Sequence, residues 1–362
     1  MALDRILLVG FRNHAASRLD GSAHLNLLVG DNGAGKTNVL EALSLFAPGR
    51  GLRRAPLVEI AQAGGAGGFT VAAALDCGDG REPVRLGTGT TRERPGRRIV
   101  QVNGAEASAV ALGEWLALGW LTPAMDTLFA DSAGARRRYM DRLALALDPI
   151  HARHASRYEA ALRERNRLLA GEVEPDAQWL ASLEAQLADA GSALARGRAA
   201  LVGRLSAALV GLPEGPFARP QLGYVAGGPL ESEPLAAELS RQRARDRAAQ
   251  RTLVGPHRDE LEVTLAATGA PAARCSTGEQ KALLIAITLA HAALAAAGRP
   301  GVLLLDEVAA HLDPVRRADL FERLRAGAAQ VWLTGTERAP FAEIEREAAV
   351  WQVAGGEVER RS

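Results

Sequence analysis

The chain contains few cysteines and few aromatic residues, and it has no long apolar run. Cys77 and Cys275 are too few for a disulfide framework and fit no metal-ligand spacing, which favours a reducing compartment. Aromatic residues make up 4% of the chain and do not interleave its basic stretches, which disfavours base stacking with single-stranded nucleic acid. No run of about 18 apolar residues could span a bilayer, and the N-terminus has no export signal. These absences predict a cytoplasmic protein without a membrane partner.

Lysine and net charge are scarce as well. The 43 basic and 42 acidic residues leave a net charge of +1, so the chain as a whole shows no electrostatic preference for nucleic acid. Only Lys36 and Lys281 are lysines, and all other basic residues are arginines. Arginine replaces lysine less freely where a compact ammonium is needed, which marks Lys36 as a functional position. A length of 362 residues exceeds the usual size of one hydrophobic core and predicts two domains.

Residues 27–43 have the pattern of a strand, a glycine-rich loop and a helix. Glycines let such a loop turn its N–H groups toward phosphate oxygens, and the helix adds the positive end of its dipole. Lys36 is expected to reach the β- and γ-phosphates of ATP, and the Thr37 hydroxyl to ligate Mg²⁺, as the pattern G-x-x-x-x-G-K-[ST] requires. The predicted nucleotide-binding residues of the loop are Gly30, Asp31, Asn32, Gly33, Ala34, Gly35, Lys36, Thr37 and Asn38.

The segments around this loop have the patterns of strands. Residues 3–9 and 25–29 are expected to form two strands joined by a polar turn. Residues 68–103 alternate apolar and polar positions in short runs, and Asn103-Gly104 gives a tight hairpin signal. These runs predict an antiparallel sheet beside the nucleotide-binding strand.

A helical region follows from about residue 130. Residues 135–170 are expected to form two helices divided at Asp148-Pro149, and residues 178–210 to form a third helix with leucines seven positions apart. A glycine and a proline between these runs mark a turn, so the sequence predicts an antiparallel arm.

Arginine is concentrated in and near this arm. Residues 131–170 hold nine arginines and five acids, and residues 241–258 hold six arginines and one aspartate. Two interpretations stay open, a solvated helix face or a surface that binds the phosphate backbone of duplex DNA. The second interpretation predicts DNA contacts by Arg136, Arg137 and Arg138.

An apolar run, residues 302–305, ends in two carboxylates. Asp306 is expected to hold Mg²⁺ through its water shell, and Glu307 to orient and deprotonate the attacking water, with Lys36 completing the catalytic set. A buried strand that merely has an acidic end is the alternative. Upstream, residues 276–281 precede a long apolar helix expected from Ala282, which makes an anion site at its start.

The order of these motifs resembles that of ABC-type ATPases. Ser-x-Gly-Glu-Gln before a helix, then Asp-Glu, then Leu312-Asp313 look like the signature, Walker B and D-loop of that family. Thr334 stands where transporters place a switch histidine. The resemblance implies further nucleotide contacts by Ser276, Gly278, Glu279, Gln280, Asp313 and Thr334.

Spacing indicates which ABC-type ATPases the chain is most similar to. Lys36 and Ser276 lie 240 residues apart, more than a transporter cassette needs, and the insert holds the arginine-rich arm. This arrangement resembles the RecF family of DNA-repair ATPases, which are related to SMC-type heads but have a short arm. The matching segments are residues 11–14, 38–42, 102–104, 136–138 with Asp141, 165–169 and, most specifically, 255–261. Arg12 and Asn13 are implied as nucleotide contacts.

The resemblance implies an α/β fold, an ABC-type head with a mixed sheet, an antiparallel β lobe and an inserted helical arm. The expected domains are the head halves 1–125 and 251–362 and the arm 126–250. Implied functions are ATP- and Mg²⁺-dependent homodimerisation, clamping of double-stranded DNA at gaps or junctions, and loading of RecA with RecO and RecR. A weak, DNA-stimulated ATPase is expected to reset the clamp. An SMC-type structural clamp and an ABC transporter subunit are the alternatives.

Two positions depart from the family pattern. Family members often have Pro-Glu-Asp-Leu where this chain has residues 123–126, and an acidic residue where it has His311. The role of the diverged segment is therefore open, and His311 fits an ordinary surface or core position as well as a functional one.

Overall fold

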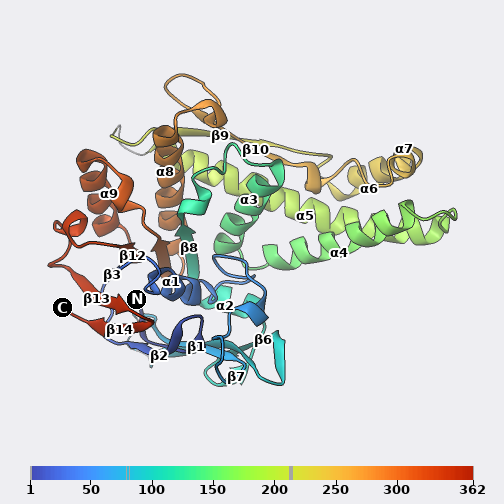
Figure 1. Ribbon diagram of the computed structural model, residues 1–362. Helices are drawn as coiled ribbons and strands as arrows, with labels where there is room; N and C mark the ends of the chain where they lie inside the picture. The colour runs from blue at the N-terminus through green and yellow to red at the C-terminus, as the bar shows by residue number, and fades with distance from the viewer. Residues whose placement is uncertain (1, 79, 81, 212–214, 362) are drawn as a thin grey trace. The chain divides into compact units, whose positions relative to one another are not determined.

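The computed structural model describes residues 2–78, 80, 82–211 and 215–361, and the chain divides into two compact units (Figure 1). Unit 1 comprises Met1–Asp126, Pro213–Ala218 and Leu284–Ser362, and unit 2 comprises Thr127–Leu212 and Arg219–Leu283. The expected C-terminal head half, residues 251–362, is divided between these units at Leu284. The three-part domain assignment stays a prediction.

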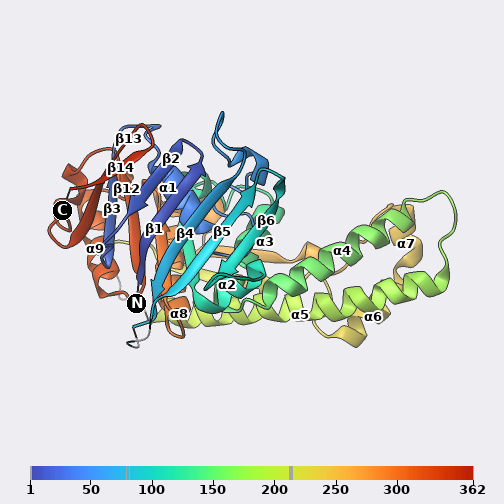
Figure 2. The same cartoon turned by 90° about the horizontal axis from the view of Figure 1, so that it is seen from below.

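Unit 1 contains two six-stranded sheets. Figure 2 shows the antiparallel sheet, whose strands lie in the order β2-β1-β4-β5-β6-β7. These strands are β1 (Ala2–Phe11), β2 (His14–Leu19), β4 (Phe69–Asp76), β5 (Val84–Thr91), β6 (Arg94–Val102) and β7 (Ala105–Glu106). The other sheet has the order β14-β13-β3-β12-β11-β8 and is parallel except at β14. Its strands are β3 (Leu25–Val29), β8 (Ala117–Leu121), β11 (Gly301–Leu305), β12 (Gln330–Gly335), β13 (Ala348–Ala354) and β14 (Glu357–Arg360).

The core of unit 1 draws residues from both sheets and from α1 (Lys36–Ser44). Every residue of β3 is buried, as expected for a parallel strand covered on both faces. Trp332 on β12 and Trp351 on β13 stack with ring centroids 5.2 Å apart. The remaining helices that lie wholly in this unit are α2 (Ala109–Trp115), α9 (Pro314–Ala326) and short 3-10 turns at Leu57–Glu59, Pro123–Met125, Ala309–His311 and Ala339–Phe341. This packing brings the carboxyl ends of the neighbouring strands β3, β12 and β11 together.

The strands expected near the N-terminus are confirmed as β1 and β3, but they belong to different sheets. The expectation of a polar turn between them was wrong, because His14–Leu19 forms β2 and pairs with β1. Its polar residues His14 and Ser17 are buried, which breaks the usual alternation and conceals the strand in the sequence. The antiparallel sheet over residues 68–103 is confirmed, and so is its hairpin, where Asn103 and Gly104 have φ of 51° and 84°.

Unit 2 contains the predicted helical arm. Helices α4 (His151–Leu169) and α5 (Ala177–Val210) lie side by side and are joined at one end (Figure 2), which confirms the antiparallel pair. The predicted break at Asp148-Pro149 is confirmed as well, because α3 (Ala133–Leu147) ends just before it and α4 begins at His151. The N-cap of α4 is Ile150, however, and Asp148 is the C-cap of α3, with its carboxylate accepting a hydrogen bond of 3.0 Å from the Ile150 N–H. The other elements are α6 (Ser232–Arg241), α7 (Arg243–Ala248), the antiparallel pair β9 (Pro220–Val225) and β10 (Glu260–Leu265), and 3-10 turns at Pro256–Arg258 and Ala272–Arg274.

Helix α8 (Thr277–Ala296) begins five residues before the expected start at Ala282, so the signature residues lie in its first turn. Among the helices that the structure describes, it alone has the length and hydropathy of a membrane span. Because 61% of that window is buried inside the protein, α8 has the character of a core helix.

Candidate active site

The glycine-rich loop joins β3 to α1 as its sequence predicts. Gly35 is the N-cap residue of α1 and has φ of 119°, a value that side-chain-bearing residues rarely adopt. A Cβ there would lie 2.8 Å from the imidazole of His14 and 2.9 Å from the amide of Asn13. Lys36 is 4% exposed, and its ammonium donates hydrogen bonds to the Gly30 carbonyl at 2.6 Å and the Asp31 carbonyl at 2.9 Å. The Lys36 ammonium is therefore bound by carbonyl groups of the loop itself.

Thr37, the residue after Lys36, contacts the acidic end of β11. The Thr37 hydroxyl lies 2.9 Å and 3.1 Å from the two carboxylate oxygens of Asp306, to which it donates. Hard oxygen ligands of this kind suit Mg²⁺, which proteins bind through one or two carboxylates together with substrate phosphates. The two residues that the sequence predicts as metal ligands, 269 positions apart, are thus brought together and fit the metal.

Thr334 at the end of β12 organises both carboxylate residues. Its hydroxyl donates to Asp306 Oδ1 at 2.8 Å and accepts from the backbone N–H of Glu307 at 2.8 Å. Glu307 has φ of 53°, a strained value for a residue with a side chain, and the contact with Thr334 holds it there. The nucleotide contact predicted for Thr334 stays a prediction, and in the structure its hydroxyl binds both acidic residues.

Asn13 and Asn38 lie on the outer side of the loop. The Asn13 side chain donates to the Ala34 carbonyl at 3.0 Å, and Asn38 donates to Asn13 Oδ1 at 2.7 Å. These amides bind the loop backbone and each other. The nucleotide contacts predicted for them stay predictions.

A buried carboxylate that the sequence analysis did not select lies beside them. Glu41 is fully buried and accepts two hydrogen bonds from Arg12, at 2.7 and 2.9 Å, and one from Arg53 at 2.9 Å. The hydrogen bond with Glu41 is the main cause that raises the pKa of Arg12. Arg53 also donates to Asn38 Oδ1 at 2.6 Å. In the sequence, the buried position of Glu41 was indicated only by its place among the apolar residues of the helix that follows the loop.

The signature residues lie in unit 2, at the start of α8. The Ser276 hydroxyl and N–H both lie 2.8 Å from Glu279 Oε2, which forms a capping box. Gln280 is turned inward and donates to the Cys275 carbonyl at 2.9 Å, while Gly278 is exposed.

Asp313 lies in unit 1, where its side chain caps α9 by accepting from the Arg316 N–H at 3.0 Å. The nucleotide contacts predicted for the signature and for Asp313 remain predictions. The side chain of His311 lies outside the described residues.

The three arginines predicted to bind DNA differ in their surroundings. Arg136 donates to both oxygens of Glu260, at 2.7 and 2.8 Å, and this hydrogen bonding is the main cause that raises its pKa. Arg137 is half-buried and donates to the Asp259 carbonyl at 2.8 Å. Arg138 is exposed on α3. Of the three, Arg138 is thus the best placed to meet a partner.

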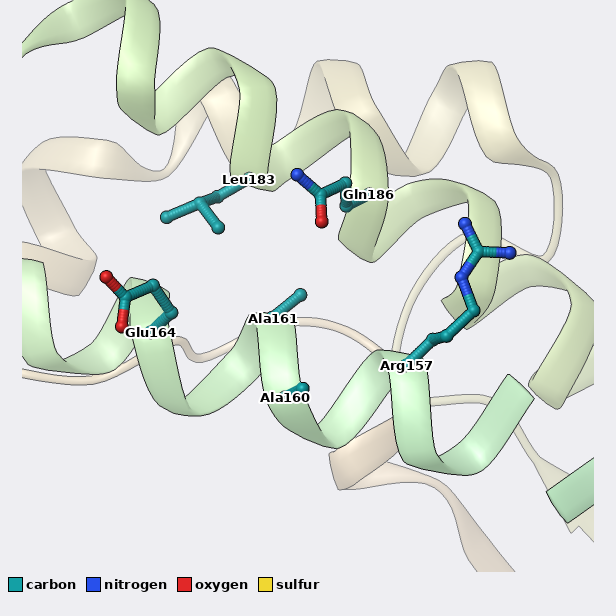
Figure 3. Close-up of a pocket in the computed structure, with 6 residues that line it drawn as sticks. All are labelled: Arg157, Ala160, Ala161, Glu164, Leu183 and Gln186. Atoms are coloured by element: carbon teal, nitrogen blue, oxygen red, sulfur yellow. The ribbon is translucent and has the colours of Figure 1, made fainter. Parts of the chain in front are cut away.

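A pocket of about 300 Å³ lies between α4 and α5, and no predicted site residue lines it. Figure 3 shows its lining, which consists of Arg157, Ala160, Ala161, Glu164, Leu183 and Gln186. Arg157 pairs with Asp189 at 3.2 Å, and Glu164 pairs with Arg167. The charged groups of the pocket are therefore paired with neighbouring side chains on α4 and α5.

Known proteins are similar to this chain in sequence and in fold. Residues 2–359 match the family described as RecF/RecN/SMC N terminal domain. The "DNA replication and repair protein RecF" of Mesorhizobium japonicum is 47% identical over 372 residues, which cover 98% of this chain and 97% of that protein. The protein of the same description from Rhizobium leguminosarum bv. trifolii is 45% identical over 377 residues, covering 99% and 98%.

Solved structures agree at the level of the fold. The recombination mediator protein RecF-ATPrS of the RecFOR pathway matches with a TM-score of 0.87 and 22% identity, over 100% of this chain and 98% of that one. An SMC head domain of Pyrococcus furiosus matches with a TM-score of 0.51 and 15% identity, over 99% and 96%. These matches confirm the expected fold class, an ABC-type ATPase head with an inserted helical arm. With near-complete coverage of curated relatives at 45–47% identity, the chain belongs to the RecF family of DNA replication and repair proteins.

Proposed function

We propose that this protein binds and hydrolyses Mg-ATP and uses the nucleotide to control a DNA-bound dimer in recombinational repair and replication restart. The observation that carries the proposal is the joining of the phosphate loop to the acidic end of β11 by the hydrogen bonds between Thr37 and Asp306. A glycine-rich turn that only connected a strand to a helix would not require a hydrogen bond to a carboxylate on another strand. The solved RecF-ATP and RecF-ATPrS structures support ATP as the ligand.

In this proposal the residues divide the chemistry between them. Lys36 leaves the loop carbonyls to neutralise the β- and γ-phosphates, while the loop N–H groups bind their oxygens. Thr37 and, through water, Asp306 would hold Mg²⁺, which would supply stabilisation of the charge that develops on the transferred phosphoryl group. Glu307 accepts the proton of the attacking water, and Thr334 keeps its backbone in place.

We further propose that the signature acts on the nucleotide of a second copy of the chain. Ser276 and Gly278 are exposed in the described structure, as a surface that covers another subunit's ATP must be. The dimer would clamp double-stranded DNA at gaps or junctions, and with RecO and RecR it would promote RecA loading. Slow, DNA-stimulated hydrolysis would reset it in the cytoplasm. Support for these partners comes from the RecFOR pathway named for a similar structure.

The proposal is tested by sedimentation of the protein with ATP, ADP or no nucleotide, each with and without gapped DNA. We expect a dimer, and a DNA-bound dimer, with ATP only. Lys36→Ala should weaken ATP binding by about 10- to 100-fold, since hydrogen bonds to a charged group contribute about 1.5–3 kcal/mol. Arg346→Ala, which removes an exposed cation outside the loop and the signature, is the control and should bind ATP as the unaltered chain does. A chain that stays monomeric in every condition would refute the proposed dimer.

Contacts between the arm and the DNA backbone should make binding depend on salt. We propose that Arg138 neutralises a phosphate, so Arg138→Ala should lower the slope of log K against log salt by about 1. Arg346→Ala removes one exposed charge from unit 1 and should leave that slope unchanged. Equal slopes for Arg138→Ala and the unaltered chain, measured by fluorescence anisotropy with duplex DNA, would remove Arg138 from the DNA surface.

A further inference from the structure

His14 contacts the phosphate-binding loop, although it is not part of the loop motif. The side chain is fully buried at the start of β2. Its Nε2 lies 3.1 Å from the Gly35 carbonyl, and its Nδ1 lies 2.9 Å from the Ser17 hydroxyl. That hydroxyl in turn lies 2.8 Å from the carbonyl of Gly356, in the turn between β13 and β14. The imidazole thus connects three segments of unit 1.

The contact with Gly35 adds to the backbone hydrogen bonds that fix the direction of the loop's peptide groups. In a planar trans peptide the C=O and the following N–H point in opposite directions. The Ala34 carbonyl is held outward by Asn13, at 3.0 Å, and by the Gly356 N–H, at 3.0 Å. The Gly35 carbonyl accepts from the N–H groups of Asn38 and Val39 in the first turn of α1, at 3.0 and 3.1 Å, and His14 Nε2 lies beside it as a third partner at 3.1 Å. The N–H groups of Gly35 and Lys36 are therefore turned inward, where phosphate oxygens bind.

The hydrogens available for this chain of contacts depend on the protonation of the ring. The contacts from Nε2 to Gly35, from Nδ1 to Ser17 and from Ser17 to Gly356 each need one hydrogen, and both carbonyls can only accept. A neutral imidazole and one hydroxyl supply two hydrogens. An imidazolium supplies the third, so only the protonated ring completes all three hydrogen bonds.

The free loop disfavours that charged form. Burial lowers the pKa of His14, and the carbonyls of Gly35 and Gly356 oppose this effect only in part. Within the described residues, no carboxylate is hydrogen-bonded to the ring. Charged residues near it on these segments include Arg12, Asp31, Lys36 and Glu357, and Arg12 pairs with Glu41. Arg18, on the same strand, pairs with Asp20.

Phosphate binding would oppose this effect of burial. A triphosphate places several negative charges on the inner side of the peptide between Gly35 and Lys36, and nearby negative charge favours a protonated histidine. Polarisation of the same peptide by a phosphate also makes the Gly35 carbonyl a stronger acceptor for the ring. Both effects act on His14 across a single peptide group.

We propose that His14 takes up a proton when the phosphates of a nucleotide fill the loop, so that nucleotide binding is coupled to protonation of this positioning residue. The inference rests on the proposed ATP binding. Because the bound form holds the proton more tightly, affinity should rise as the pH falls through the pKa of the bound state and level off below that of the free state. Each pKa unit of difference corresponds to about a tenfold gain in affinity.

Isothermal titration calorimetry with ATPγS near pH 7, in buffers of different ionisation enthalpy, measures the protons taken up on binding. His14→Gln keeps an N–H donor for the Gly35 carbonyl but cannot titrate. Ser17→Ala keeps the ring but removes the acceptor for its second proton. We expect both variants to bind ATPγS with less proton uptake and a flatter pH profile than the unaltered chain. Titration of the nucleotide's own phosphates is common to all three proteins and cancels in the comparison.

The outcomes separate the inference from the function on which it rests. Equal proton uptake by the unaltered chain, His14→Gln and Ser17→Ala overturns the role of His14 and leaves ATP binding intact. No binding of ATPγS by the unaltered chain overturns the proposed function and the inference with it. If His14→Gln fails to fold, Ser17→Ala alone decides, because it leaves the histidine and its contact with the loop in place.

Discussion

Replacement of Glu307 by glutamine is expected to slow ATP hydrolysis by about 10²- to 10⁴-fold, the usual contribution of a general base. The amide has the shape of the carboxylate but cannot accept the proton of the attacking water. Nothing in the nucleotide-binding loop is altered, and the backbone contact from Glu307 to Thr334 does not involve the side chain. ATP should therefore still bind, and phosphate release under multiple turnover measures the loss.

The same variant tests the proposed dimer. If hydrolysis separates the subunits, Glu307→Gln should accumulate as an ATP-bound dimer in sedimentation, with and without DNA. Glu337→Gln makes the same chemical change at an exposed position after β12 and should hydrolyse ATP normally. Normal turnover by Glu307→Gln would refute its role as the base. Turnover by the unaltered chain that is negligible even with duplex DNA would favour a structural clamp of the SMC type.

The second large effect concerns the stability of unit 2. Arg165 on α4 is fully buried and donates to Asp246 at 2.6 Å, to Thr252 at 2.8 Å and to Glu184 at 3.1 Å. Both carboxylates are themselves buried. Arg165→Met should destabilise the unit by about 3–5 kcal/mol, because removal of one partner leaves a buried charge uncompensated. For a unit of this size the thermal midpoint should fall by about 10 °C.

Differential scanning calorimetry checks this expectation against a matched variant. Arg163→Met lies two positions away on the same helix, where the arginine is 73% exposed and only 3.8 Å from Glu159. Exposed ion pairs of this kind contribute about 0–1 kcal/mol, so the control should melt close to the unaltered chain. Equal midpoints for the two variants would show that the buried network does not stabilise the arm.

Local patterns in the sequence were sufficient for the elements that carry the nucleotide chemistry. The loop from Gly30 to Thr37 follows from glycine spacing and from the apolar strand and helix on either side, all of which act within a few residues. The long leucine repeat of α5 likewise predicts its buried stripe, since helical periodicity is a local property. Order and spacing of the motifs were enough to indicate the family.

The strand β2 shows where local patterns fail. His14 and Ser17 are polar, so their burial in a strand can be recognised only when their hydrogen-bond partners Gly35 and Gly356 are known. Those partners lie 21 and 339 positions away. No periodicity in six residues can signal a contact of that kind, because it depends on which distant turns meet at the loop.

The sequence by itself determined which residue types are available for phosphate, metal and base chemistry. Only the tertiary structure decided which partners each of them has. Arg136 and Arg138 are equivalent in the sequence, yet one is bound to Glu260, 124 positions away, and the other is exposed. Thr334 became a partner of Asp306 because β12 lies beside β11 in the parallel sheet. Backbone conformation is encoded locally, whereas hydrogen bonds and ion pairs between distant side chains form only where packing of the core places their strands and helices side by side.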